Sequence, residues 1–451
     1  MNTVTFQFIE KNKLIALFLT IALLISAYFL LPSDFTSAET ITILIFLFAA
    51  CFWVFEIIPL FATSLCIIVL LSFFLTKPGG ALGLDHTGFK LFFVSFSSPV
   101  IMLFLGGFVL ATAIKKHHVG LYLTEKFIKK LGTRPVAVFA GLTFLSAFFS
   151  MWISNTAATA LMLSLFIPII DQIDKEDPFR KALLLTICFS ANIGGITTPI
   201  ATPPNALAIG ELAEQGLRVN FLDWMVKTVP IAFLLLLISG TLLYFFYRPK
   251  TKELKLTFPE KIKIGKEGFA VVLITFLMIG FWLTTAFHKI PESMISLLGV
   301  ALFVATRLID SADIRNLKWD ILILMWGALA LGDAVSESGV VSHLFSVSSN
   351  FSPDIWFVAF ICGVTVLVSS LMSSTATASL LLPIAMTFGG EWKIYLVMLI
   401  AICSSFSFAL PVSTPPNAHV YSFGELKTTD MLKPGIILSL LGLIIALLLF
   451  R

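Results

Sequence analysis

A cluster of polar side chains inside a long uncharged segment places the strongest constraint on this chain. No charged residue occurs between Arg134 and Asp171, yet the middle of that segment, from Ser150, is S-M-W-I-S-N-T-A-A-T-A. In hydrocarbon, each unsatisfied polar group costs several kcal/mol unless it is buried in protein or lines a wet cavity. The segment therefore predicts a polar site deep inside apolar structure.

The same kind of segment occurs a second time, and each copy is followed by a second matched motif. Residues 369–379 are S-S-L-M-S-S-T-A-T-A-S, and T-P-P-N-A begins at both Thr202 and Thr414. Small residues that merely allow close helix packing are an alternative explanation, but four motifs in matched order disfavour it. We expect the four segments to meet at one site in the middle of a membrane.

The composition indicates an integral membrane protein. The chain is 58% hydrophobic and 12% charged, with a mean hydropathy of +0.99, whereas soluble proteins carry about 25% charged residues. The net charge of +4 gives no indication of nucleic-acid binding. The five cysteines lie in apolar runs without metal-ligand spacing, so no cofactor is expected.

Hydropathy predicts an all-α membrane protein with about eleven transmembrane helices and two re-entrant helical hairpins. A span needs about 20 apolar residues. The apolar segments 135–170 and 353–388 are interrupted by polar tips, and their arms are short for a full crossing, so we expect them to be the hairpins. The predicted spans are 14–31, 40–56, 58–76, 91–114, 182–210, 229–247, 268–287, 293–309, 320–341, 393–418 and 434–450.

The distribution of basic residues predicts the orientation. Residues 248–267 contain seven Lys or Arg, including Lys261, and residues 115–134 contain six. Because basic loops face the cytoplasm, both segments should be cytoplasmic. Eleven spans then place the N-terminus inside, the C-terminus outside, the first hairpin on the cytoplasmic side and the second on the outer side.

The span before each hairpin is also repeated. L-F-L-G-G-F-V-L from Leu103 parallels L-M-W-G-A-L-A-L from Leu324. An odd number of spans separates the two, so the halves should point in opposite directions across the membrane. An inverted repeat with helices broken near the midplane is the architecture of many secondary transporters.

The four motifs suit an anion. Thr202 and Thr414 each precede two prolines, a pattern typical of a hydroxyl-capped helix start, and the serines of both tips are also N-cap residues. Each helix N-terminus carries roughly +0.5 charge and free N–H groups. No Lys or Arg is close in sequence, so we expect hydroxyls, amides and backbone N–H groups to bind a divalent anion. Unwound carbonyls remain for Na⁺.

These motifs resemble those of the divalent anion/sodium symporters, which carry dicarboxylates, citrate or sulfate. The resemblance covers most of the chain and includes S-S-F-S-F-A-L-P-V-S from Ser404, the stretch from Trp53 to Pro59, and Trp319-Asp320. It implies a homodimer with a scaffold domain and a transport domain that moves like an elevator. The scaffold is expected to comprise residues 1–90 and 229–319, the latter with the cytoplasmic loop 248–267. The transport domain would comprise a first repeat at 91–228 and a second repeat at 320–432, and a C-terminal helix would follow at 433–451.

The resemblance also implies specific binding residues. The anion would be held by the two hairpin tips and the two proline breaks, with one Na⁺ beside each tip. The substrate-binding residues carried over are Ser154, Asn155, Thr156, Thr202, Pro203, Ser373, Ser374, Thr375, Thr414 and Pro415. The sodium ligands would be Ser150, Asn155 and the Ala201 carbonyl at the first site, and Ser369, Ser374 and the Ser413 carbonyl at the second.

Ser374 departs from the family pattern, in which the second tip is usually S-N-T. A hydroxyl reaches less far than an amide, so the second sodium site is in question. Coupling to fewer sodium ions and sodium-independent anion exchange both remain open.

We predict a transporter of the cytoplasmic membrane that carries C4–C5 dicarboxylates with Na⁺, because two similar tips suit two carboxylates. Sulfate or another oxyanion is the alternative substrate, and a passive anion channel is the alternative class. The chain contains no phosphate loop, which disfavours an ATP-driven pump. It contains no H-E-x-x-H or G-x-S-x-G motif, and His419 is the only histidine near a tip, so an enzyme is not expected. Asp333 and Glu337 fall late in the span 320–341, where they are either functional or at the outer water boundary.

Overall fold

The computed structural model describes residues 3–84, 88–256, 263–340, 343, 354–386, 388 and 392–450, and its regular structure there is entirely helical. Residues 257–262 of the predicted loop 248–267, including Lys261, and residues 341, 353 and 387 of the predicted span and hairpin lie outside this part. Within these residues, seven segments are long and apolar enough to cross a membrane, so the predicted all-α membrane class is confirmed, while the predicted number of about eleven spans stays a prediction. They are α1 (Thr3–Leu30), α2 (Ser37–Phe55), α4–α5 (Lys90–Val94 and Pro99–Lys116, joined by the 3-10 turn Ser95–Ser97), α11 (Phe221–Phe246), α12 (Lys266–Leu283), α16 (Trp319–Glu337) and α22 (Thr428–Leu449).

The remaining predicted spans are shorter or divided. The segments 58–76 and 293–309 form α3 (Leu60–Leu71), extended by a π-helical turn (Ser72–Thr76), and α14 (Glu292–Ala305). The segments 182–210 and 393–418 are each broken before their T-P-P-N-A motif, as predicted. The two broken pairs are α9 (Phe179–Gly195) with α10 (Pro203–Glu214), and α20 (Trp392–Ser404) with α21 (Pro415–Tyr421). Short helices α13 (Thr285–His288) and α15 (Ser311–Arg315) flank α14.

Both predicted helical hairpins are present, and each bends at its polar tip. The two arms of each hairpin pack against one another. The arms are α7 (Pro135–Ser150) and α8 (Asn155–Ile170) in the first hairpin, and α18 (Ile355–Leu371) and α19 (Ser374–Met386) in the second.

The basic segment 115–134 contains a helix that the sequence analysis did not predict, α6 (Val119–Leu131). It packs on α7 with Thr124 and Ile128 buried, while Lys126, Lys129 and Lys130 are exposed. Its apolar face is narrow and its lysines are numerous, so hydropathy alone indicated a polar connection. The helix is amphipathic.

Two close helix crossings use the glycines of the repeated L-F-L-G-G-F-V-L and L-M-W-G-A-L-A-L motifs. A Cβ atom at Gly106 of α5 would lie 2.5 Å from the Ser296 Cβ atom of α14. A Cβ atom at Gly327 of α16 would likewise overlap Ser64 of α3. Small residues let the helix backbones approach, so α5 is tied to α14 and α16 is tied to α3.

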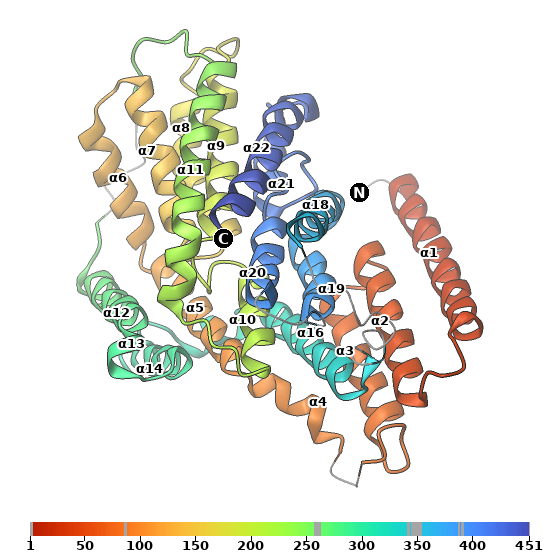
Figure 1. Cartoon of the computed structure of the whole chain (residues 1–451). Helices are drawn as coiled ribbons and strands as arrows, with labels where there is room; N and C mark the ends of the chain where they lie inside the picture. The colour runs from red at the N-terminus through yellow and green to blue at the C-terminus, as the bar shows by residue number, and fades with distance from the viewer. Residues whose placement is uncertain are drawn as a thin grey trace.

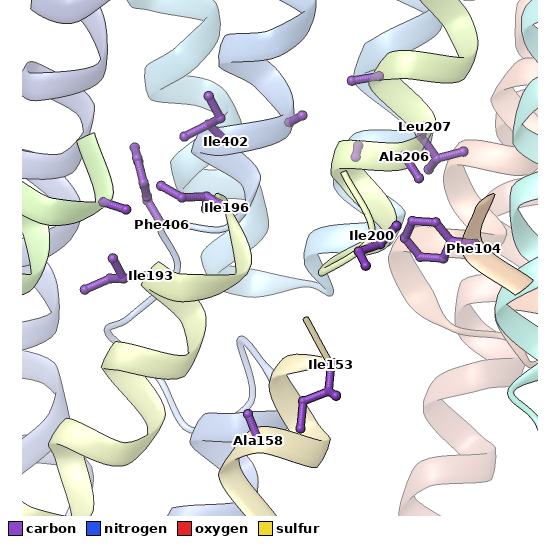
Figure 2. Packing of buried hydrophobic residues seen from close by; sticks show 14 of the residues in the cluster. Phe104, Ile153, Ala158, Ile193, Ile196, Ile200, Ala206, Leu207, Ile402 and Phe406 are labelled. Atoms are coloured by element: carbon purple, nitrogen blue, oxygen red, sulfur yellow. The ribbon is translucent and has the colours of Figure 1, made fainter. Parts of the chain in front are cut away.

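In Figure 1 the first hairpin and α9 lie at the upper left, beside the second hairpin, α20 and α21, with α12 and α14 below and α2 and α3 to the right. The broken helices α9 and α21 pack on one another, and each also packs on α8 of the first hairpin, while α20 packs on both arms of the second. Side chains from both breaks, Ile196 and Phe406 among them, belong to one buried apolar cluster (Figure 2). Phe189 of α9 also packs edge-on against Phe408, with ring centroids 5.5 Å apart. The packing therefore brings the four predicted motifs to one place.

Candidate binding site

A cavity of about 410 Å³ lies where the two tips and the two breaks converge. Every predicted substrate-binding residue except Ser373 lines it. The lining residues are Ser154, Asn155, Thr156, Asn192, Ala201, Thr202, Pro203, Pro204, Lys318, Asp320, Ile321, Ser374, Thr375, Ser405, Thr414, Pro415 and Pro416.

The first tip is fixed by local hydrogen bonds. The Ser154 hydroxyl accepts a hydrogen bond from the Ala157 N–H at 3.4 Å and caps α8. Ser150 Oγ, at the end of α7, lies 2.7 Å from both Asn155 Oδ1 and the Ala191 carbonyl of α9. A Cβ atom at Gly195 would overlap the Asn155 amide, so a glycine is needed there for the amide to fit.

The second tip has the same plan with different residues. Ser373 caps α19 by accepting from the Ala376 N–H at 3.2 Å, as Ser154 caps α8. Ser369 Oγ donates to the Ser404 carbonyl and lies 3.2 Å from Ser407 Oγ and 3.5 Å from Ser374 Oγ. Serines thus replace the amide of the first tip.

The two breaks are held by equivalent asparagines. Asn205 Nδ2 donates to the Gly195 and Thr198 carbonyls at 2.9 and 2.8 Å. Asn417 Nδ2 makes the matching contacts with the Ser407 and Leu410 carbonyls at 3.3 and 3.0 Å. Gly195 and Ser407 therefore occupy corresponding positions in the two breaks.

The predicted cap at Thr202 is wrong, whereas the cap at Thr414 is confirmed. Thr414 Oγ1 accepts from the Asn417 N–H at 3.3 Å and from Asn192 Nδ2 at 3.1 Å. Thr202 precedes α10, but its hydroxyl makes no cap bond. The position corresponding to Asn192 is Ser404, whose hydroxyl is committed to the Ala401 carbonyl at 2.7 Å, so no side chain orients Thr202.

Two buried oxygens of the cavity are left without partners among the described residues, Thr202 Oγ1 and Asn192 Oδ1. Thr202 is 7% exposed and Asn192 is 1% exposed. Buried polar atoms without hydrogen bonds are rare. A hydroxyl that can donate and an amide oxygen that can ligate a hard cation fit an anion and Na⁺ in this cavity.

The predicted sodium ligands lie beside the tips in which they were placed. Ser150 contacts Asn155, and Ala201 lines the same cavity. Ser369 contacts Ser374. Ser413 Oγ donates to the Ser370 carbonyl at 2.9 Å, which joins the second break to its hairpin. Both sets offer oxygen atoms only, which is the donor type that hard cations prefer.

One basic side chain lines the cavity, which the sequence analysis did not expect. Lys318, at the start of α16, lines the cavity, and its ammonium group lies 3.4 Å from Ser154 Oγ. Asp320 lies beside it. Lys318 is far in sequence from both tips. In the sequence analysis, only the family resemblance at the next two residues, Trp319-Asp320, pointed to this region. Asn192 and Ser405 were also missed, although each lies in a polar stretch just before a break.

Comparisons with known proteins agree with this architecture. The family model described as "Citrate transporter" matches residues 50–393 and 287–451. An uncharacterised transporter of Methanocaldococcus jannaschii is 32% identical over 89% of this chain and 90% of its own length. A sodium-dependent dicarboxylate transporter of Staphylococcus saprophyticus is 29% identical over 92% of this chain and 86% of its own.

The solved structures include one with a similar fold, the YdaH transporter of Alcanivorax borkumensis. It superposes with a TM-score of 0.60 at 13% identity, covering 87% of this chain and 98% of that one. At this identity the likeness concerns the fold alone. The family match and the two relatives show that this chain belongs to the citrate transporter family, and that it is a multi-pass membrane transporter and not an enzyme.

Proposed function

We propose that this protein carries C4–C5 dicarboxylates such as succinate, malate or fumarate across the cytoplasmic membrane, coupled to Na⁺. The main support is the cavity at the four converging motifs, where buried Thr202 Oγ1 and Asn192 Oδ1 have no partner among the described residues. The N-termini of α8, α10 and α19 also meet there and favour negative charge. Sodium-dependent dicarboxylate transport by similar proteins supports the same substrates.

Lys318 adds a positive charge at the cavity. Its contact with Ser154 joins the start of α16 to the first tip. We infer that it attracts the anion and that Asp320 offsets its charge when the cavity is empty.

We also propose an elevator mechanism in a homodimer, with the orientation predicted from the basic loops and the two halves as an inverted repeat. The matched bonds of Asn205 and Asn417 support the repeat. The hairpins and broken helices would form the moving core. We assign α5 and α16 to the frame, although they fall within the predicted ranges 91–228 and 320–432, because their glycines pack them on α14 and α3.

Transport by purified protein in liposomes tests the substrate and the coupling. Labelled succinate uptake is measured with an inward Na⁺ gradient, with K⁺ replacing Na⁺, and with unlabelled succinate or sulfate inside. We expect accumulation that needs Na⁺. Uptake of labelled sulfate is measured in the same way. Accumulation of sulfate but not succinate would identify an oxyanion transporter, and equilibration without accumulation or counterflow would identify a channel.

Substitution of Thr202 tests the site itself. Thr202→Val keeps the shape and removes the hydroxyl, so we expect the KM for succinate to rise about tenfold, the effect of losing roughly 1.4 kcal/mol of binding. Thr306→Val, at the exposed end of α14, is the matched control and should not change transport. An unchanged KM in Thr202→Val would contradict the assignment.

Sodium-independent dicarboxylate exchange is the second candidate. Ser374 at the second tip replaces an amide, and Ser407 in the second break replaces a glycine, which changes the second cation site. Succinate counterflow that is equally fast in Na⁺ and K⁺ would favour exchange.

A further inference from the structure

A second cavity, of about 260 Å³, lies between the far ends of α10 and α16, away from the binding site. It is unusual in being lined by several acidic side chains from both helices. Those that matter here are Glu211, Glu214, Asp333 and Glu337, together with Gly332 and Lys393.

Glu211 is the most enclosed of these acids. Its side chain is on the inner face of α10, and the residue is 4% exposed. No hydrogen-bond donor contacts its carboxyl group within the described part of the chain. A Cβ atom at position 332 would lie 2.5 and 2.6 Å from the two carboxyl oxygens, so Gly332 provides the space that they occupy.

The neighbouring groups do not neutralise Glu211. Asp333 Oδ2 accepts from Ser95 Oγ at 2.6 Å and is within hydrogen-bonding reach of Glu214, which is exposed at the cavity mouth. Lys393 of α20 donates to Gln215 Oε1 at 2.6 Å instead of to an acid of the cavity.

The other elements packed on α10 add little charge. α19 contains no ionisable side chain, and the lysines of α5 are at its opposite end. Glu337 is exposed on α16. Lys90 of α4 lines an adjoining cavity with Glu214 and Asp333. The surroundings of Glu211 are therefore acidic on balance.

A buried carboxylate without a partner is very unfavourable, and it is usually neutralised by taking up a proton. Nearby acidic groups strengthen this tendency, because like charges oppose ionisation. No group of three or more acidic, histidine or cysteine side chains in the described residues has an arrangement that could hold a metal ion. A proton is therefore the ligand that the geometry favours.

We propose that Glu211 is a proton-binding site at the contact between α10 and α16, occupied while the two helices are packed together. Under the elevator mechanism proposed above, on which this step rests, α10 belongs to the moving core and α16 to the frame. Separation of the helices would admit water and release the proton. The proton site itself does not depend on the identity of the transported anion.

Infrared spectroscopy of the whole protein in lipid nanodiscs, in potassium buffer without succinate, tests the site independently of transport. We expect the C=O stretch of protonated carboxyl groups at pH 7, with one contribution from Glu211 and one from the Glu214–Asp333 pair, which shares a proton. Glu211→Gln should lack the Glu211 contribution, which is lost from the wild type on alkaline titration. Glu337→Gln, an exposed neighbour of the same cavity, should retain it.

Thermal unfolding gives a second readout. Because a proton is bound in the folded state, stability should decrease as pH rises through the range in which the infrared signal is lost. Glu211→Gln mimics the neutral acid and should not show that decrease. Gly332→Ala should force the carboxyl group outward and weaken the infrared signal at pH 7, which keeps the test valid if the glutamine variant does not fold.

A wild-type protein without the protonated-carboxyl signal at neutral pH would overturn the proposal. So would a signal that is undiminished in Glu211→Gln, or stabilisation by Na⁺ with no dependence on pH. If the signal behaves as expected and succinate transport is absent, the proton site stands and the proposed function fails. If the signal is absent and succinate is still transported, the proton site fails and the proposed function stands.

Discussion

The two hairpin tips differ at one pair of packed positions. In the first half, Asn155 fits because Gly195 has no side chain. In the second half, Ser374 is shorter, and Ser407 occupies the position that corresponds to Gly195. In the first half a large tip residue faces a glycine, and in the second half a smaller tip residue accompanies a serine at the equivalent position. The replacement of the family's asparagine by Ser374 is therefore accompanied by a second difference from the first half, Ser407 in place of a glycine.

An asparagine at position 374 should fit the second tip only if position 407 is a glycine. We expect Ser374→Asn to lower succinate uptake about tenfold, because overpacking costs roughly 1–3 kcal/mol. Ser374→Asn combined with Ser407→Gly should recover most of the activity. Uptake in proteoliposomes measures both, with Ser407→Gly as the control. Wild-type uptake by the single asparagine variant would show that the two positions do not compete for space.

At another position, the buried carboxylate of Asp177 fixes the loop before α9. Asp177 is 3% exposed and accepts hydrogen bonds from the Phe179 N–H at 3.0 Å and from the Thr251 hydroxyl and N–H at 2.7 and 2.9 Å. Burial by itself would raise the pKa of Asp177, but these hydrogen bonds outweigh it and lower the pKa. The charged carboxylate therefore ties the segment after α11 to the start of α9.

Asp177 should make stability depend on pH. A lowered folded-state pKa means that its contribution is complete above about pH 4, near the ordinary aspartate pKa, and is lost as pH falls through the folded value. We expect Asp177→Asn to be roughly 1–3 kcal/mol less stable at pH 7, with the difference shrinking below pH 4. Thermal unfolding in detergent measures it, with exposed Glu176→Gln as control. An equal deficit at both pH values would contradict this account.

At the scale of helices, the glycines that face α14 and α3 have a structural role. Gly106→Ala places a methyl group 2.5 Å from the Ser296 Cβ atom. We therefore expect a loss of roughly 1–3 kcal/mol, measured by thermal unfolding. Combining it with Ser296→Gly should restore part of the loss. Gly280→Ala, on an open face of α12, is the control and should be neutral or slightly stabilising. If Gly106→Ala and Gly280→Ala change the free energy of unfolding equally, the crossing of α5 and α14 can adjust to the added methyl group.

At the scale of the whole molecule, the proposed mechanism requires the central core to slide along the frame. Ile200, between α9 and α10, faces α5 near Phe104 (Figure 2). A Cβ atom at Gly107 would lie 3.3 Å from the Ile200 Cβ atom, close to the separation in a disulfide.

A crosslink at this contact should stop transport. In a variant without the native cysteines, we expect oxidation of Gly107→Cys/Ile200→Cys to reduce succinate uptake at least tenfold and reductant to restore it, because the linked core cannot move. Each single-cysteine variant is the control and should be insensitive to oxidation. Full uptake by crosslinked protein would show that this contact persists through the cycle.

Hydropathy, proline and N-cap preferences act locally along the chain, so the sequence predicted where the apolar helices are interrupted, and the family resemblance at those interruptions gave most of the residues that line the cavity. Three features follow from the tertiary structure alone: the Thr202 hydroxyl without a partner among the described residues, Lys318 in the cavity, and the contact between Glu211 and Gly332. Each depends on which side chain faces it from a distant helix. That choice follows from how close the helix backbones approach, which no local pattern encodes.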